Sequence, residues 1–439
     1  MSSKRFWLLI SLLIVVSLAF AACQPTTPAT QEPQTQATEP PAAEEPAATE
    51  PAAEEPVATE PAAEEPAAEE GLIFGMLLVG PYNDHGYSEA HYNGGLYVQD
   101  KLPGSEMLYI DKVNPADRPG TTPAQLAEDL VSKGAKIVVF NSDDMKDSAI
   151  EFAQNHPDIW TIHASGDSAW EEGKDFQNLP NMINPMGRME YGKMIAGCAA
   201  ALTTQTGQIG YLGPLINDET RRLTASAYLG ARYCWEEYLG NDVADLQFRV
   251  NWIGFWFNIP GVTSDPTQVA DDFFNSGFDV VISGIDTTEG LIEAKKFADS
   301  GKAVWAIPYD YEGACEEGSS VCLGVPYFNW GPAYLEYLTA FQEGTLEAGW
   351  HWLSPDWSDI NNPDTSAVGF KKGDALSEEA SAEVDRFIEE LAGGLNLWTG
   401  PIILQDGTEY VPEGQEATDF EVWYLPQLLE GMEGQSVAE

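Results

Sequence analysis

Five histidines are spread along the chain, and none has a partner at a spacing typical of metal or nucleophile chemistry. His85 and His91 are six residues apart, a spacing that does not place two ligands together on a helix. The G-x-S-x-G elbow, the H-E-x-x-H zinc pair, a phosphate-binding loop and the G-x-G-x-x-G fingerprint are absent from the sequence. We therefore expect a protein that binds its ligand without transforming it and uses neither cofactor nor metal, although a Ser–His–Asp site assembled from distant residues stays open.

Acidic and aromatic residues gather in turns that follow predicted strands. Such turns are GPYNDHGYSEAHYNG (80–94) after the first strand and NSDDMKD (141–147) after the third. Asp286 and Asp310 come directly after two later strands. Ligands bind where the carboxyl ends of parallel strands meet at one edge of a sheet, so we expect these turns to line a pocket. An Asp in a turn is also typical of a helix N-cap, and the turn 141–147 fits both interpretations.

Short apolar runs alternate with amphipathic stretches over most of the chain. The first run, LIFGMLLV (72–79), is typical of a strand buried on both faces. We expect strands over 72–79, 107–110, 137–140, 159–163, 208–212, 246–252, 279–283, 303–307 and 321–328. We expect helices from about residue 88 and over 123–133, 146–155, 188–204, 220–239, 266–276, 289–299 and 332–343. The alternation predicts right-handed βαβ units in parallel sheets, arranged as two similar lobes and followed by an irregular, Trp-rich tail.

The N-terminus predicts export and lipid attachment. Lys4 and Arg5 precede an apolar run over 6–20 that is of signal-peptide length and too short for a comfortable membrane span. The small residues before Cys23 resemble a bacterial lipobox, in which the cysteine is lipidated. We expect an extracytoplasmic protein anchored to the cell membrane by lipid at Cys23. The alternative is an ordinary secretory signal with an incidental cysteine.

The segment 24–70 is a Pro/Ala/Glu/Thr repeat without Lys, Arg or aromatic residues. Such a composition cannot bury enough apolar surface to offset chain entropy, so we expect a disordered spacer between the membrane and the folded part. The whole chain has 70 acidic and 21 basic residues, a net charge of −49. Most of this charge lies in the folded part, which argues against nucleic acid as a partner.

Four of the five cysteines lie in the predicted folded part. Cys315 and Cys322 flank a short polar loop, and an oxidising compartment permits a disulfide between them, although free thiols fit equally well. Cys198 and Cys234 lie in apolar, helix-like stretches, and we interpret them as buried small hydrophobic residues. No C-x-x-C pair is present, which argues against thiol-redox or zinc-ribbon chemistry.

The likeness to a known family rests on six segments that occur in the family's order. The chain resembles the basic membrane protein family, whose best-known members are receptors for purine nucleosides that feed an ABC transporter. The likeness extends over nearly all of residues 71 to about 432. The six segments are GPYNDHGYSEAHYNG (80–94), GRMEYGKMIAGCAAALTTQTGQIGYLG (187–213), NWIGFWFNIP (251–260), FDVVISGIDTTEGLIEA (278–294), VPYFNWGPAY (325–334) and LWTGPI (397–402).

The resemblance implies an α/β fold of type I periplasmic-binding-protein architecture. Two Rossmann-like lobes with parallel sheets would be joined by crossover strands, with the ligand in the cleft between the lobes. We expect crossovers near 185–188, 308–310 and 349–353. The expected parts are a lipoprotein signal peptide (1–22), the lipidated cysteine with its linker (23–70), a first lobe (71–187 and 309–348) and a second lobe (188–308 and 349–432).

The resemblance also implies ligand contacts in the first turn. The family's motif opens with an acidic residue, here Asp84, and its Phe, which stacks on the base, is Tyr87 here. Any aromatic face can serve for stacking. The next residue of the motif, Asn in the nucleoside receptors, is Ser88, and His91 resembles a histidine of one branch of the family.

Further contacts are implied in later turns. Asp147 matches an aspartate that accepts hydrogen bonds from a base, although Asp143 or Asp144 fits equally well. Asp310 matches the aspartate that grips ribose hydroxyls, which suits a vicinal diol. Asn329 stands where nucleoside receptors have a lysine, so base and nucleoside both remain open.

We therefore predict the substrate-binding subunit of an ABC importer, a monomer that hands a purine base or nucleoside to a permease and its ATPase. Asp286 is a further candidate contact, and Trp256 and Trp330 offer stacking faces unless they belong to the core. A receptor for a sugar or another small organic solute is the first alternative. A secreted hydrolase of doubly wound fold and a surface adhesin or sensor are the others.

Overall fold

The computed structural model describes residues 71–438. The predicted signal peptide, the lipidation site Cys23 and the linker to residue 70 lie outside the described residues. Within the described range, no helix combines the length and the apolar character that a membrane crossing requires.

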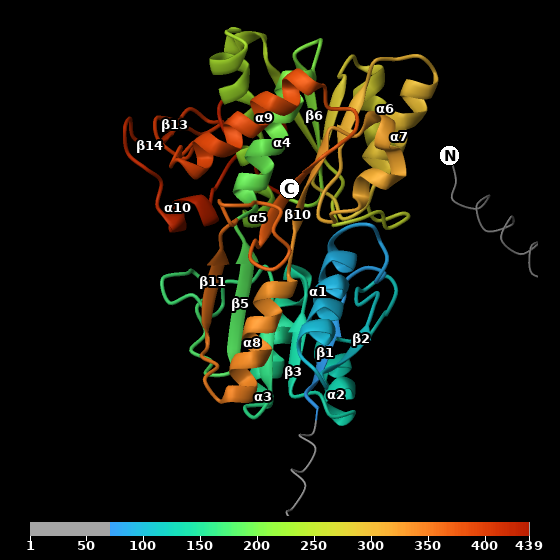
Figure 1. The fold of residues 1–439 in the computed structure, drawn as a ribbon, viewed down its shortest axis with the longest axis vertical. Coiled ribbons are helices and arrows are strands. Elements are labelled where there is room, and N and C mark those ends of the chain that lie inside the picture. The colour runs from blue at the N-terminus through green and yellow to red at the C-terminus, as the bar shows by residue number, and fades with distance from the viewer. Residues whose placement is uncertain (1–70, 439) are drawn as a thin grey trace, which may run out of the picture. The chain divides into compact units, whose positions relative to one another are not determined.

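The first lobe is built on a six-stranded parallel sheet of order β11-β5-β4-β3-β1-β2. Helices α1 and α8 pack side by side on one face, and α2 and α3 cover the other (Figure 1). The bounds are β1 (Ile73–Leu77), α1 (Tyr87–Lys101), β2 (Glu106–Ile110), α2 (Pro123–Ser132), β3 (Ile137–Phe140), η1 (Asp143–Met145), α3 (Lys146–Asn155), β4 (Trp160–His163), β5 (Met182–Gly187), α8 (Gly331–Glu343) and β11 (Gly349–Leu353).

Burial on both faces explains why these strands are apolar throughout. In β3, Ile137 and Val139 pack beneath α1 and α8, whereas Val138 and Phe140 pack beneath α2 and α3. Successive side chains of a strand point to opposite faces, so a sheet covered on both sides needs apolar residues at every position. The expected strand over 72–79 is confirmed in this sense, with its ladder over Ile73–Leu77.

The second lobe holds a five-stranded parallel sheet of order β15-β7-β6-β8-β9. Its bounds are α4 (Met189–Thr203), β6 (Gln208–Gly213), α5 (Asp218–Tyr233), the π-helical turn η2 (Cys234–Tyr238), η3 (Val243–Asp245), β7 (Gln247–Trp252), α6 (Pro266–Asn275), β8 (Val280–Ser283), α7 (Glu289–Asp299), β9 (Trp305–Ile307), η4 (Ala314–Val321) and β15 (Met432–Glu433). The predicted α/β fold with two parallel sheets is confirmed.

The chain crosses between the lobes first where β5 ends and α4 begins, as predicted, and then along two antiparallel strands, β10 (Gly324–Phe328) and β12 (Val368–Lys372). Leu323 lies in the core of the second lobe, and Phe328 lies in that of the first. On β12 the order is reversed, because Val368 belongs to the first core and Phe370 to the second.

Two of the expected crossovers lie elsewhere. After 308–310 the chain stays in the second lobe. The turn η4 packs on α7, and the backbone of Cys322 forms an isolated β-bridge with Ala306 of β9. The strand β11 at 349–353, which we expected to begin a return to the second lobe, is instead the edge strand of the first sheet. The returning strand is β12, about fifteen residues further along.

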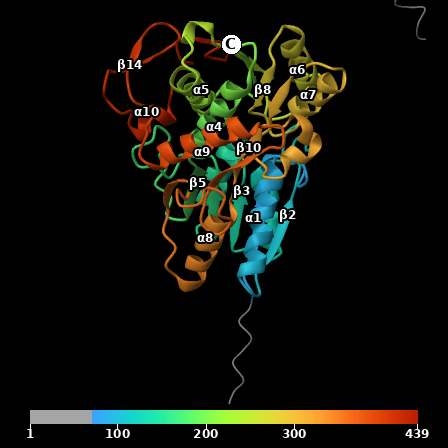
Figure 2. The same cartoon turned by 45° about the horizontal axis from the view of Figure 1, so that its top comes forward.

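The expected irregular tail is wrong, because the C-terminal segment contains regular elements. They are α9 (Glu378–Ala392), β13 (Ile402–Ile403), β14 (Glu409–Val411), α10 (Asp419–Trp423) and β15. Ser377 caps α9, and Ala380, Val384, Phe387 and Leu391 form its buried face at helical spacing. Figures 1 and 2 show α9 crossing over α4 of the second lobe.

Within residues 71–438 the structure contains two disulfides, Cys198–Cys234 and Cys315–Cys322. Cys198 and Cys234 are buried, as expected, but they are joined in a disulfide, which the interpretation as small hydrophobic residues did not include. Helices α4 and α5 approach so closely that a Cβ on Gly197 would lie 1.9 Å from the carbonyl oxygen of Ala227. This contact brings the two cysteines together across 36 residues of sequence.

Loop length predicts that the two disulfides stabilise the fold to different extents. Replacing Cys198 and Cys234 by Ala opens a loop of 36 residues, and replacing Cys315 and Cys322 opens one of 7. We expect losses in the free energy of unfolding of about 4 kcal/mol and about 2 kcal/mol, because the longer cross-link removes more entropy from the unfolded chain. Urea unfolding of both double variants measures the difference, and a larger loss for the shorter loop would contradict this entropic account.

Candidate ligand-binding site

A cavity lies at the carboxyl ends of the strands of both sheets. Residues that follow β1, β3 and β4 line it from the first lobe, and residues that follow β6, β7, β8 and β9 line it from the second. The lining residues are Tyr87, Ser142, Asp143, Ser165, Tyr211, Pro214, Glu219, Thr220, Leu223, Trp256, Gly284, Asp286, Tyr309 and Asp310.

The two lobes touch beside the cavity. Gly86 lies against the second lobe so closely that a Cβ at this position would be 1.7 Å from the carbonyl oxygen of Asp286. Asn217, the N-cap of α5, donates a hydrogen bond from Nδ2 to Asp143 Oδ2 in the first lobe at 3.2 Å. These contacts define a closed arrangement of the lobes around the cavity.

Tyr87 is held in the cavity wall by a layer of aromatic residues. Its hydroxyl lies 2.7 Å from Ser165 Oγ, and its ring meets the edge of His91 at 4.5 Å. His91 stacks on Trp330 at 4.2 Å and lies 2.5 Å from the hydroxyl of Tyr334 through Nδ1. Burial lowers the pKa of His91 well below its ordinary value, so the imidazole is neutral. His91 and Trp330 therefore support Tyr87 from behind and do not line the cavity.

The side chain of Asp310 is buried in the cavity wall without a hydrogen-bond partner among residues 71–438. Both carboxylate oxygens are buried and have no hydrogen-bond partner within the described part of the chain. Its backbone has a φ of 72°, a left-handed conformation that is rare for residues other than glycine. Hydrogen bonds to strand β10 hold this conformation, from Asp310 N to Pro326 O at 3.1 Å and from Phe328 N to Asp310 O at 3.0 Å. A strained, buried and unpaired carboxylate indicates a ligand contact.

Four carboxyl groups share the cavity: Asp143, Glu219, Asp286 and Asp310. Burial raises the pKa of Asp286 and of Asp310 well above their ordinary values, and neighbouring acidic groups raise both further. Burial also raises the pKa of Asp143 and brings that of Glu219 to about 7. Among residues 71–438, no group of three or more His, Cys, Asp or Glu side chains is arranged to hold a metal ion.

Lys193 of α4 is the buried cation behind this cluster. Its Nζ donates a hydrogen bond to the carbonyl oxygen of Ser283 at 2.8 Å and lies 3.1 Å from the ring centroid of Tyr309. Its charge lowers the pKa of Asp310 against the effect of burial. Burial in turn lowers the pKa of Lys193 to about 7. The sequence signal that we missed is a lysine in the middle of an Ala-, Gly- and Met-rich helix.

Four of the predicted site residues line the cavity: Tyr87, Trp256, Asp286 and Asp310. Asp147 does not, because it is exposed in the first turn of α3, one helical turn beyond Asp143. Asn329 turns away and donates from Nδ2 to the carbonyl oxygens of Pro363 and Ser366.

Asp84 and Ser88 shape the first turn without lining the cavity. The carboxylate of Asp84 accepts hydrogen bonds from the backbone N–H groups of Gly86, Ser88 and Glu89 at the start of α1. Ser88 Oγ accepts a hydrogen bond from Gly80 N at 2.9 Å. Both side chains therefore hold the turn that carries Tyr87.

Several cavity residues escaped the sequence analysis. Glu219 and Thr220 lie in the first turn of α5, which follows β6, and Ser165 follows β4. These residues could have been predicted too, because ligands bind at the carboxyl ends of parallel strands. Tyr211 lies within β6 and Tyr309 precedes Asp310, where an aromatic residue is as typical of the core.

The closed two-lobed fold with a buried cavity at the strand ends is that of type I solute-binding proteins. The profile of the Bmp family, described as ABC transporter substrate-binding protein PnrA-like, matches residues 73–354. This is more than half of the chain, and the chain belongs to this family. The predicted relationship is confirmed.

Individual relatives are distant. A purine-binding protein of Brucella abortus is 24% identical over 79% of this chain and 88% of its own length. A putative ABC transporter glucose-binding protein of Haloferax volcanii is 23% identical over 80% of this chain and 78% of its own. Among solved structures, an ABC transporter solute-binding protein of Aeropyrum pernix superposes with a TM-score of 0.57 at 12% identity, covering 76% of this chain and 93% of that one.

The family establishes the general role. The protein is an extracytoplasmic substrate-binding component of an ABC importer, and its partners are a small-molecule ligand and the permease with its ATPase. Binding proteins of this family are not enzymes, so the prediction of binding without chemistry is confirmed by family membership.

The ionisation of Glu219 predicts a pH-dependent stability. Its pKa rises from 4.5 to about 7 in the folded state, so the unfolded chain ionises first and the folded state loses stability as pH rises between these values. We expect Glu219→Gln to stabilise the ligand-free protein at pH 8, on the order of 2 kcal/mol, and to have little effect at pH 4.5. Thermal unfolding at both pH values measures this. Glu237→Gln, at an exposed position of the same lobe, is the control, and an equal gain at both pH values would contradict the prediction.

Proposed function

We propose that the ligand is a purine base or purine nucleoside. The observation that carries this proposal is that aromatic residues of both lobes, Tyr87 and Trp256, line one cavity together with the unpaired carboxylate of Asp310. Flat apolar faces suit a purine ring, and closure of the lobes would enclose the ring between them. The name of the Brucella abortus relative, a purine-binding protein, supports the same class of ligand.

The polar groups of the cavity suit the edge of a purine. Ring N–H and exocyclic amino groups are donors, and the carboxyl groups of Asp143, Glu219, Asp286 and Asp310 supply acceptors. Asp310 would accept either a base N–H or the vicinal hydroxyls of a ribose. Nucleoside receptors of the family have a lysine where this chain has Asn329, and the buried Lys193 is a cation beside Tyr309 and Asp310 on a different element.

A monosaccharide is the second candidate. The name of the Haloferax volcanii relative is that of a putative glucose-binding protein. Carboxylates accept hydrogen bonds from sugar hydroxyls, and aromatic faces pack against the apolar face of a pyranose. The two candidates share Asp310 as a contact and differ in whether the aromatic residues stack on a flat ring.

Calorimetric titration of residues 71–439 with adenine, adenosine, guanosine and glucose tests the proposal. We expect binding of at least one purine, and at least about tenfold weaker binding by Trp256→Ala and by Asp310→Asn, because each loses a central contact of a buried ligand. Asp147→Asn removes an exposed carboxylate outside the cavity and should bind as the unaltered protein does. Heat with glucose and none with any purine would overturn the purine assignment.

We also propose that Cys23 is lipidated and that residues 24–70 hold the binding domain away from the membrane surface. The anchored protein would be a monomer. The lipobox-like sequence before Cys23 and the repeat that follows it support this. Expressed in a bacterial host, the full chain should sediment with membranes and incorporate labelled fatty acid. Cys23→Ser should be released in soluble form without label, since the anchor depends on the acyl chains. Release of the unaltered chain would contradict the proposal.

A further inference from the structure

The C-terminal segment beyond the family match, residues 355–438, inserts a short helix between the two lobes. Adjacent residues at α10 belong to different cores. Val422 and Leu425 pack in the core of the second lobe, whereas Trp423 and Tyr424 pack in the core of the first. The segment therefore connects the lobes noncovalently, in addition to the crossover strands.

Tyr424 is fixed against the loop that follows β4. Its ring lies parallel to Trp170 at 5.7 Å, with an interplanar angle of 3°, and Lys174 Nζ lies 4.1 Å from its ring centroid. Trp170 stacks in turn on Trp350 of β11 at 4.1 Å. The aromatic rings thus attach the C-terminal segment to the edge of the first sheet.

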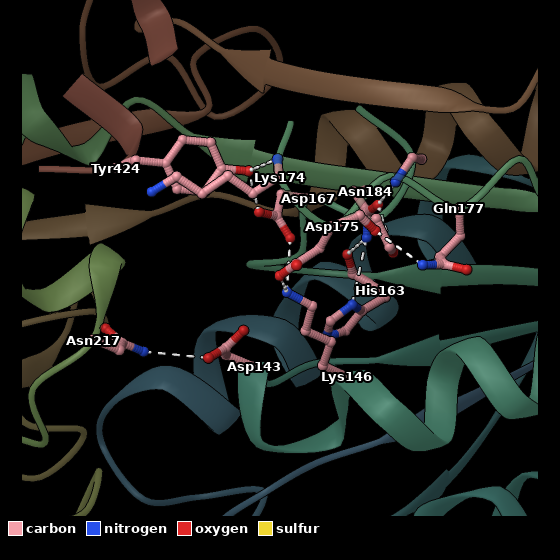
Figure 3. A network of polar contacts seen from close by, with 12 residues as sticks. Asp143, Lys146, His163, Asp167, Lys174, Asp175, Gln177, Asn184, Asn217 and Tyr424 are labelled. Atoms are coloured by element: carbon pink, nitrogen blue, oxygen red, sulfur yellow. Dashed lines mark hydrogen bonds and ion pairs between the residues drawn. The ribbon is translucent and has the colours of Figure 1, made fainter. Parts of the chain in front are cut away.

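The hydroxyl of Tyr424 enters a polar network that Figure 3 shows from close by. It donates a hydrogen bond to Asp167 Oδ2 at 2.5 Å and accepts one from Lys174 N at 2.8 Å. Asp167 Oδ1 accepts a hydrogen bond from Lys146 Nζ at 2.9 Å, and Lys146 also pairs with Asp175. One tyrosine hydroxyl therefore binds both a carboxylate and a backbone group of the same loop.

This network reaches the ligand cavity through Ser165. Ser165 lies two residues before Asp167 on the loop, lines the cavity and contacts the hydroxyl of Tyr87. Ser165 has a φ of 65°, a left-handed conformation that requires support from its surroundings.

We propose that Tyr424 is a positioning residue for the ligand site and acts through Asp167. By binding Asp167 and Lys174 N, Tyr424 fixes the conformation of the loop 165–175. The loop in turn orients Ser165, and the contact of Ser165 with the hydroxyl of Tyr87 orients Tyr87 toward the ligand. This inference rests on the proposed function only in taking the cavity as the ligand site. It assigns to residues outside the family match an influence on affinity that is transmitted through the loop 165–175.

Hydrogen exchange of the ligand-free protein tests the positioning without reference to any ligand. Tyr424→Phe keeps the ring and removes the hydroxyl. We expect the amides of residues 165–175 to exchange about tenfold faster or more, because a hydrogen bond to a charged acceptor is lost. The core of the second lobe, including residues 280–283, should exchange as before. Unchanged protection of the loop would overturn the proposal.

Tyr410→Phe is the matched control. Tyr410 belongs to the same C-terminal segment, and its hydroxyl bonds to the carbonyl oxygen of Glu421 within that segment. We expect no change in the exchange of residues 165–175, and an equal change in both variants would show a general loosening and overturn the proposal. Asp167→Asn, which weakens the same contact from the other side, should reproduce the effect of Tyr424→Phe.

Affinity provides the second readout. For the purine or sugar that binds the unaltered protein, we expect Tyr424→Phe to raise the dissociation constant about tenfold and Tyr410→Phe to leave it unchanged. Equal affinities of all three proteins would overturn the influence on the site. Absence of purine binding by the unaltered protein would count against the proposed ligand alone, since the exchange experiment still decides whether Tyr424 positions the loop.

Discussion

The burial of acidic groups in the interlobe cavity is the constraint on which the rest of the site depends. Asp310 is fully buried and unpaired, and three further carboxyl groups face the same space. Burying a carboxylate without hydrogen bonds costs free energy. A ligand with hydrogen-bond donors would recover part of this free energy by binding to the carboxyl groups. The left-handed backbone of Asp310 and its hydrogen bonds to β10 hold its carboxyl group in a fixed position.

Lys193 shows how the fold limits that cost. This chain has Asn329 where nucleoside receptors of the family have a lysine, and the structure shows a buried cation on α4 instead. A lysine fully buried beside Tyr309 and Asp310 offsets part of the negative charge without occupying the cavity wall. Since electrostatic compensation depends on distance rather than on sequence position, a comparison of motifs alone could not locate it.

Sequence reasoning found β1 to β4 and β6 to β9, and with them the residues that follow the ends of these strands. Tyr87, Trp256, Asp286 and Asp310 could be predicted because a parallel sheet brings its carboxyl ends together. Asp147 could not be distinguished from Asp143 because the turn η1 sets which residue faces the cavity. The Cys198–Cys234 bond could not be foreseen because it depends on the close packing of α4 against α5.

His91 and Trp330 show a different limit. Both follow the expected pattern of the binding motif, yet they form a second layer behind Tyr87. An aromatic residue near a strand end can face a ligand or support the residue that does, and only the packing decides between these roles.

The C-terminal segment changes how the two lobes can separate. It adds β15 to the edge of the second sheet and inserts α10 between the cores, so opening must either carry Tyr424 away from Asp167 or bend the segment between Tyr424 and Leu425. Either movement disrupts buried aromatic contacts in addition to those across the cavity. The closed arrangement is therefore stabilised at two places, by the contacts beside the ligand site and by the segment that lies beyond the family match. We expect ligand affinity to depend on both, because a ligand that binds the closed form gains from any contact that favours closure.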